Sequence, residues 1–307
     1  MKFSHLIIFS SLLLHMACTK DIELNGGTPD FEVVSTTGTF KRGEPVLFKF
    51  AGDADNISFY SGEPQKDYAF RNGRTEAATG GLLAFTSAVT GGAQAGQFSV
   101  LVSSDFNGNY TDIAAVKAAT WTDITARFTL GSTATFAASG TKDVTDLLVK
   151  GKPLYVAFRY ITKPQQQNGA ARTWMVQGYT FQGITALGNL TGADMFTGAF
   201  RLVTSNPATA PARSAVSTSR LTLLANEFTT DNDPLTENWA IGAPVAWEQL
   251  NLGPDRPVGI KGGTGARLES YAHTYTQPGT YKASFVAANV NIDERSEVVR
   301  EVTVTIQ

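Results

Sequence analysis

Four oxygen-bearing side chains stand at short spacing in the first half of the chain. They are Asp105, Asn107, Asn109 and Asp112, in the pattern Asp-x-Asn-Gly-Asn-x-x-Asp. Carboxylate and amide oxygens at alternate positions suit a hard cation such as Ca²⁺. The glycine occupies the fourth place rather than the sixth, and no glutamate closes the loop, so the pattern departs from an EF-hand. The two alternatives are a structural calcium site and a turn closed by its own hydrogen bonds; no other cofactor is expected.

Aromatic side chains beside turns form a second group of candidates, because a sugar ring can stack its apolar face on Trp or Tyr. Tyr110 follows a Gly/Asn turn and Tyr68 follows a Gly/Pro turn, so both are expected to be exposed. Trp247 is the third candidate, with packing at a domain interface as the alternative. Trp121 and Trp174 lie in strand-like segments, where packing in the core is the better interpretation.

The first 18 residues have the composition of an export signal. One lysine precedes an apolar run from Leu6 to Leu14, which is too short to cross a bilayer as a helix. Ala17 and Cys18 follow, and Cys18 is the single cysteine of the chain. This arrangement resembles the signal of bacterial lipoproteins, whose cysteine carries the lipid; an ordinary signal peptide is the alternative. The next residues, Thr19-Lys-Asp21, resemble the surface-export signal of Bacteroidota lipoproteins.

Residues suited to catalysis are scarce beyond this signal. Of the 3 histidines, only His273 lies after residue 17, so neither a Cys–His pair nor a histidine metal cluster can form. A glycosidase needs only two carboxylates, and no acid pair stands out. A formal net charge of −2 gives no field for holding nucleic acid. We therefore expect a protein that is not an enzyme, with a glycoside hydrolase as the less favoured alternative.

Alternating apolar residues indicate that β-strands position these groups. Val46, Phe48 and Phe50 share one face of a strand, and the same alternation returns near the C-terminus. Residues 153–160 are apolar on both faces apart from one arginine, which is typical of a central sandwich strand. A short helix is expected at 112–117. With 29 Gly and only 17% charged residues, the composition agrees with an all-β protein.

The segment from His273 to Tyr281, His-Thr-Tyr-Thr-Gln-Pro-Gly-Thr-Tyr, resembles the last hairpin of the polycystic-kidney-disease (PKD) domain, an immunoglobulin-like sandwich. Residues 46–50 and 56–60 are similar to the opening strands of that family, although Phe-Tyr-Ser-Gly-Glu at 59–63 replaces its Trp-x-Phe-Gly-Asp-Gly signature. The resemblance implies a sandwich assembled from both ends of the chain and a structural role for the histidine. Two small separate domains are the alternative.

Residues 104–108, 119–125, 156–160 and 173–174 resemble, in this order, the jelly-roll modules of Bacteroidota adhesins, which are related in shape to carbohydrate-binding modules. We therefore expect an all-β fold: an immunoglobulin-like (PKD-like) sandwich, split in sequence, with an inserted jelly-roll β-sandwich. The expected divisions are a lipoprotein signal peptide (1–17), a tether (18–29), the first part of the immunoglobulin-like domain (30–74), the jelly-roll domain (75–245) and the second part of the immunoglobulin-like domain (246–307).

The whole order of motifs resembles an uncharacterised family of Bacteroidota surface lipoproteins, whose members accompany outer-membrane importers of glycans and other nutrients. This resemblance implies a non-catalytic protein that is anchored in the outer membrane through Cys18 and faces the cell surface. It would bind a glycan or another extracellular polymer beside an importer, through Tyr68, Tyr110 or Trp247. A structural or adhesion lipoprotein that contacts another protein is the alternative.

Overall fold

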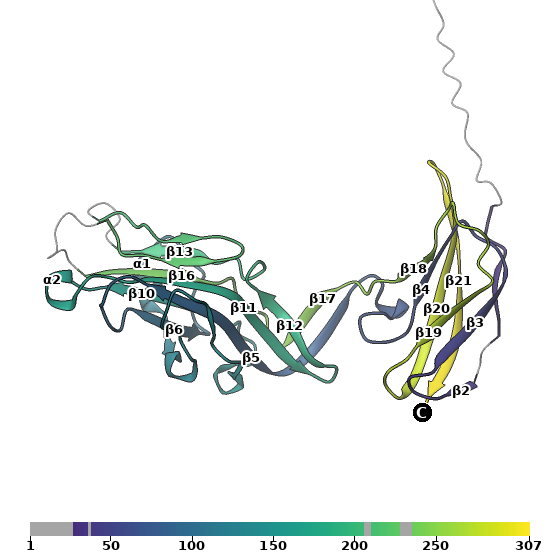
Figure 1. Ribbon diagram of the computed structural model, residues 1–307, viewed down its shortest axis with the longest axis horizontal. Coiled ribbons are helices and arrows are strands. Elements are labelled where there is room, and N and C mark those ends of the chain that lie inside the picture. Colours follow the sequence, from purple (N-terminus) through teal and green to yellow (C-terminus); the bar gives the residue numbers. More distant parts are fainter. Residues whose placement is uncertain (1–26, 36–37, 206–209, 228–234) are drawn as a thin grey trace, which may run out of the picture. The chain divides into compact units, whose positions relative to one another are not determined.

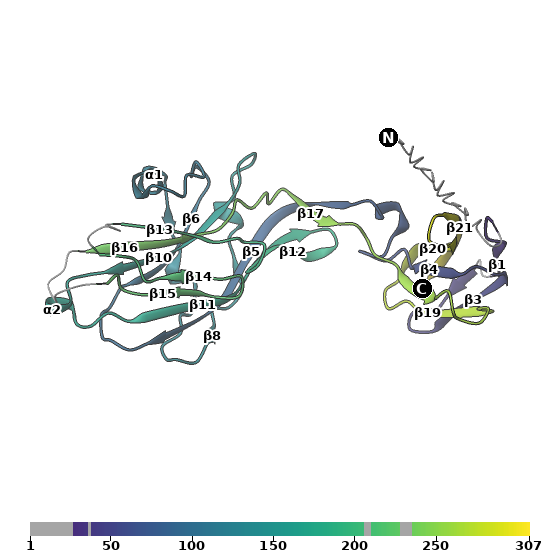
Figure 2. The same ribbon diagram turned by 90° about the horizontal axis from the view of Figure 1, so that it is seen from above.

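The structure is a computed structural model that describes residues 27–35, 38–205, 210–227 and 235–307. Cys18 and the expected signal peptide lie outside the described residues. The described chain consists of β-strands joined by loops and a few short helices (Figures 1 and 2), which confirms the all-β prediction. No helix within these ranges is both long and apolar enough to cross a membrane.

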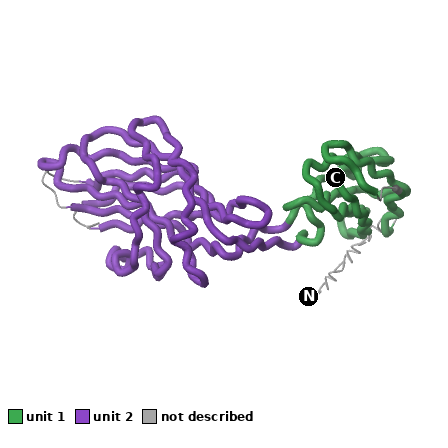
Figure 3. The backbone as a smooth tube through the Cα atoms, turned by 90° about the horizontal axis from the view of Figure 1, so that it is seen from below, with its two compact units in different colours: residues 1–71, 255–307 green, residues 72–254 purple. Residues whose placement is uncertain are grey.

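The chain forms two compact units (Figure 3). Unit 1 comprises residues 1–71 and 255–307, and unit 2 comprises residues 72–254. The sequence pattern instead placed the divisions after residues 74 and 245. The difference arises because strand β17 (Gln249–Gly253) pairs with the start of strand β5 (Arg74–Thr90), which brings both segments into unit 2.

Unit 1 is a sandwich whose two sheets each combine strands from both ends of the chain. The smaller sheet has the order β1 (Phe31–Ser35), β3 (Pro45–Gly52) and β19 (Ser270–Thr274). The larger sheet has the order β18 (Val258–Lys261), β4 (Asn56–Tyr60), β20 (Gly279–Val290), β21 (Arg295–Ile306) and β2 (Gly38–Phe40). All pairs are antiparallel except β2 with β21, and the 3₁₀ helix η1 covers Tyr68–Phe70.

The alternation of apolar residues accounts for the core of unit 1. In β3, the side chains of Val46, Phe48 and Phe50 are buried, and the residues between them are exposed. Strand β20 contributes Phe285, whose ring centroid lies 5.1 Å from those of both phenylalanines of β3. Because β3 and β20 come from opposite ends of the sequence, this core requires both segments.

The hairpin motif that resembles the PKD domain lies at the edge of this core. The Tyr275 hydroxyl donates to the Ser61 carbonyl over 2.9 Å, and His273 Nε2 lies 2.8 Å from Glu63 Oε2. Between these partners, Gly62 has a φ of 82°, and a Cβ there would lie 2.7 Å from a backbone nitrogen of β20. Only glycine is compatible with this close approach of the two chain segments.

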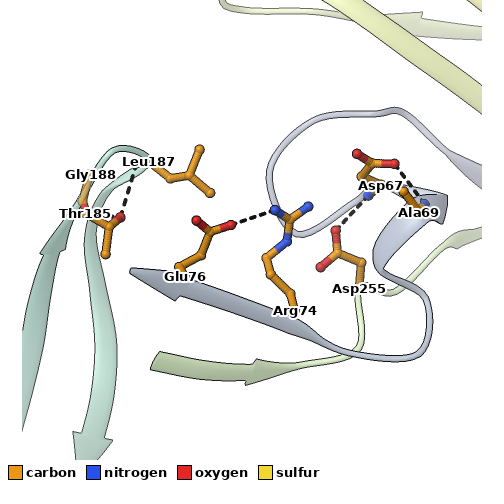
Figure 4. A network of polar contacts seen from close by, with 8 residues as sticks. All are labelled: Asp67, Ala69, Arg74, Glu76, Thr185, Leu187, Gly188 and Asp255. Carbon is orange, nitrogen blue, oxygen red and sulfur yellow. Dashed lines mark hydrogen bonds and ion pairs between the residues drawn. The ribbon is translucent and has the colours of Figure 1, made fainter. Parts of the chain in front are cut away.

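Polar contacts close the loops at the edges of each unit (Figure 4). In unit 1, Asp67 Oδ1 accepts from the Ala69 amide over 2.9 Å and caps η1. The Asp67 amide in turn donates to Asp255 Oδ2 over 2.8 Å, which ties the two segments of unit 1 together. In unit 2, Arg74 Nη1 lies 2.7 Å from Glu76 Oε1, and both side chains are largely buried. Buried charged groups of this kind need such partners to offset the loss of water.

Unit 2 also contains two sheets. One has the order β13 (Arg201–Thr204), β16 (Thr236–Ile241), β10 (Tyr155–Thr162), β6 (Phe98–Ser103) and β7 (Thr122–Asp123). The other has the order β14 (Ala215–Val216), β15 (Leu221–Leu223), β11 (Thr173–Thr185), β5 and β17, with β12 (Gly188–Asp194) on β11 and with β8 (Ala137–Ala138) and β9 (Lys142–Asp143) on β5. Short helices lie between the strands: α1 (Ile113–Ala118), α2 (Gln165–Asn168), η2 (Thr125–Arg127) and η3 (Thr145–Leu147).

Strand β10 is buried on both faces, as its sequence predicted. Val156, Phe158 and Tyr160 face the main core between the two sheets. Tyr155 and Ala157 face a second, smaller core that also includes a residue of α1. The prediction of a short helix near 112–117 is confirmed by α1, whereas α2 was not predicted because its four residues carry no apolar periodicity.

Candidate functional site

A surface groove lies at one end of unit 2, where β6 ends and β10 begins. It consists of two hollows of about 320 and 350 Å³, and Lys152 borders both. The first hollow is lined mainly by Gly151, Lys152, Pro153, Trp247, Glu248 and Gln249. The second is lined mainly by Ser103, Asp105, Thr120, Thr122, Val149 and Lys152. We call these two hollows together the Trp247 groove.

The first hollow is mostly apolar and is held by contacts between two loops. Trp247 is 9% exposed, packs on the main core and donates from Nε1 to the Lys152 carbonyl over 3.1 Å. The Gly151 amide donates to Glu248 Oε2 over 2.7 Å. Leu154 and Val245 exchange two backbone hydrogen bonds of 3.0 and 2.9 Å. These contacts fix the walls of the hollow before any ligand arrives.

The second hollow is more polar and contains an ionised carboxylate. Asp105 Oδ1 accepts from the Ser103 hydroxyl over 2.7 Å and from the Thr120 amide over 2.9 Å. The hydrogen bonds from Ser103 and Thr120 lower the pKa of the Asp105 carboxyl. Both of these hydrogen bonds end on Oδ1. Beside it, Val149 is 42% exposed and gives the hollow an apolar edge.

Of the three predicted aromatic candidates, only Trp247 lines the groove. Tyr68 lies in unit 1, where the Arg71 guanidinium covers its ring at 4.3 Å from the centroid. Tyr110 packs on the smaller core of unit 2 and donates its hydroxyl to a backbone carbonyl over 3.0 Å, and burial raises its pKa. The Arg201 guanidinium lies 4.9 Å from the Tyr110 ring centroid. An arginine thus occupies a stacking position on both rings, Tyr68 and Tyr110.

The four residues predicted to bind calcium each accept a hydrogen bond within their own loop. Asn107 Oδ1 accepts from the Asn109 amide over 2.9 Å, and Asn109 Oδ1 accepts from the Thr111 amide over 3.0 Å. Asp112 Oδ1 accepts from an amide of α1 over 2.8 Å and caps that helix. Asp105 is bonded as described above. Within the described ranges no group of three or more His, Cys, Asp or Glu is placed to hold a metal ion, and the calcium assignment stays a prediction.

Several groove residues were not predicted from the sequence. Lys152, Val149 and Glu248 belong to loops that show no periodicity and no recognisable motif. The only local signal was the Gly151-Lys-Pro153 sequence, which is typical of a turn but of no particular chemistry. The groove exists because the fold brings together three loops that are far apart in the sequence.

The family described as "Domain of unknown function (DUF5017)" matches residues 17–200. This range includes the whole of β1 to β12 and one wall of the Trp247 groove. None of the curated proteins and none of the solved structures compared with the chain matches it. Since the match covers more than half of its length, the chain belongs to the DUF5017 family.

Proposed function

We propose that the protein is a non-catalytic, lipid-anchored surface protein that binds a glycan in the Trp247 groove. The observation that supports this most is that Lys152 lines both an apolar hollow and a polar hollow. A sugar has apolar C–H faces and a rim of hydroxyl groups, so it needs both kinds of wall. Small-molecule sites commonly combine an apolar lining with a few fixed polar groups.

Each side of the groove has a role in this proposal. Pro153 and the accessible part of Trp247 contact the C–H face of one sugar ring. Asp105 Oδ2 accepts hydroxyl hydrogens from the next ring, and Lys152 donates to ring or hydroxyl oxygens between them. The hydroxyl groups of Thr120 and Thr122 lie on the same wall as Asp105 and add donors and acceptors. Two hollows in series suit a chain of sugars better than a single one.

Binding is tested by isothermal titration of the chain lacking residues 1–18 against a panel of polysaccharides. For a polysaccharide that binds, Asp105→Asn and Lys152→Ala are expected to raise Kd about tenfold or more, because each removes a charge-assisted hydrogen bond. Lys150→Ala is the matched control, since Lys150 is exposed in the same loop and does not line the groove. Thermal melting of each variant verifies the fold. If no polysaccharide binds a folded chain, or if both variants bind like the wild type, the proposal is wrong.

Anchoring is tested separately on the full chain in cells that export it. Cys18→Ser is expected to move the protein from the membrane fraction to the soluble fraction, because two or three acyl chains are needed for stable attachment. Thr19→Ser is the control that leaves the cysteine in place. Mass spectrometry of the N-terminal peptide reports the lipid directly. An unlipidated wild-type protein, cleaved and soluble, would instead indicate an ordinary signal peptide.

A further inference from the structure

Helix α2 lies at the opposite end of unit 2 from β17 (Figures 1 and 2). A third hollow, which is strongly polar, is lined by Gln165 of this helix. Its volume is about 210 Å³, and its polar lining consists of Gln165, Arg172, Thr173, Arg213 and Asn226. We call it the Arg172 pocket. It shares no lining residue with the Trp247 groove, so it does not depend on the function proposed above.

The charge of this pocket is positive. Two guanidinium groups, of Arg172 and Arg213, line it, and none of the described residues that line it is acidic. Among the residues that the structure describes, neither guanidinium has a hydrogen-bond or ion-pair partner. The Nε of Arg172 is buried and unpaired. An unpaired buried donor of a charged group costs free energy, so this arrangement favours a ligand that brings acceptor oxygens.

The backbone of Arg172 is held by a buried network. The Arg172 amide donates to Gln97 Oε1 over 2.9 Å, and the Tyr160 hydroxyl donates to the Arg172 carbonyl over 2.7 Å. Gln97 Nε2 donates to the Tyr160 hydroxyl oxygen over 3.0 Å, which closes the network. Gln97 is 2% exposed and Tyr160 is fully buried. A network satisfied in this way holds the base of the arginine in place before binding.

Two other pocket-lining residues, Asn226 and Gln165, are also held by hydrogen bonds. Asn226, 1% exposed, donates to the Ala210 carbonyl over 2.6 Å and accepts from Asn238 Nδ2 over 2.7 Å. Gln165 Oε1 accepts from the Ala171 amide over 2.9 Å, which leaves the amide hydrogens of Gln165 for a ligand. The walls of the pocket thus present donors from two arginines and one glutamine.

We propose that the Arg172 pocket binds the anionic group of an acidic sugar, either a carboxylate or a sulfate ester. Guanidinium groups match both anions, because their paired N–H donors bond two oxygens at once. Arg172 and Arg213 clasp the anion, and Gln165 and Thr173 donate to its remaining oxygens or to neighbouring hydroxyls. A volume of about 210 Å³ has room for one such sugar residue rather than for an extended polymer.

The test titrates the chain lacking residues 1–18 with sodium glucuronate, glucose 6-sulfate and glucose at one ionic strength. Glucuronate or glucose 6-sulfate is expected to bind at least about tenfold more tightly than glucose, and the comparison between them identifies the preferred anion. Arg213→Gln and Arg172→Gln should each weaken that binding about tenfold or more. Arg220→Gln is the matched control, because this arginine is exposed in the same unit and does not line the pocket.

Arg213→Gln is the decisive variant, since the Arg213 side chain is exposed and its replacement opens no cavity in the core. Thermal melting shows whether Arg172→Gln, with its buried Nε, retains the fold. Added sodium chloride should weaken glucuronate binding, because salt screens the attraction between the guanidinium groups and the anion. Equal binding of glucose and the acidic sugars, or full binding by Arg213→Gln, would overturn the proposal.

Discussion

Phe285→Ala is expected to lower the free energy of unfolding of unit 1 by about 3–5 kcal/mol, as other large-to-small changes of buried aromatic residues do. The Phe285 side chain is fully buried. Its ring centroid lies between 4.9 and 6.5 Å from those of Phe31, Phe48, Phe50 and Phe59. All four belong to the N-terminal segment of unit 1, whereas Phe285 belongs to the C-terminal segment. The substitution therefore removes packing contacts between the two segments.

The unfolding of the two units can be followed separately. All four tryptophans lie between residues 121 and 247, within unit 2, so tryptophan fluorescence reports that unit. In a urea titration of Phe285→Ala, tryptophan fluorescence follows the unfolding of unit 2 alone. Far-UV circular dichroism should show an earlier transition for unit 1. Ile292→Ala is the control in the same unit, because that side chain is 85% exposed. A wild-type circular dichroism curve for Phe285→Ala would contradict the expectation.

The matching change in unit 2, Phe158→Ala, is expected to cost a similar 3–5 kcal/mol and to shift the fluorescence transition. Phe158 is fully buried in β10, and its ring centroid lies 5.2 to 6.4 Å from those of Phe85, Phe98, Tyr179 and Phe200. Phe85 and Tyr179 belong to one sheet of unit 2 and Phe98 to the other, and Phe200 lies just before β13. Removing the ring therefore opens a cavity between the sheets.

Each substitution should also destabilise the other unit, because the coupling free energy between the two units is reciprocal. The ends of folded unit 2 are neighbours, because Arg74 pairs with Gly253. When unit 2 unfolds, folded unit 1 has to hold together the ends of a loop with the length of unit 2, residues 72–254, which costs about 5 kcal/mol of chain entropy. Circular dichroism should then show both units unfolding earlier. Phe196→Ala, at a side chain 69% exposed, is the control. Independent unfolding of the two units in both variants would contradict this reasoning.

Much of the fold could be predicted from the sequence because strand periodicity is a local property. The alternation of Val46, Phe48 and Phe50 predicted which face of β3 is buried. The apolar run of 153–160 predicted that β10 is covered on both sides. The exact ends of unit 2 could not be predicted, because they depend on the pairing of β17 with the start of β5.

The candidate site was less accessible to sequence reasoning. Asp105 and Trp247 were singled out for different reasons, as a metal ligand and as a stacking platform, and the structure places both at one groove. Turn composition predicted that Tyr68 would be exposed, but it could not show that Arg71 covers its ring. Arg172 was not identified at all, because an arginine at the start of a strand is ordinary until its neighbours are known.

The division of unit 1 between both ends of the chain imposes an order of events during synthesis. The partner of Ser61, Tyr275, is made 214 residues later. At ribosomal speeds this delay is roughly 10 to 40 seconds. During it, β3 lacks its partner β19, β4 lacks both of its partners, β18 and β20, and the core of unit 1 is incomplete. Unit 2 is continuous and can finish folding first. Until the C-terminal segment is made, the early strands expose phenylalanine side chains and unpaired backbone edges, both of which favour aggregation.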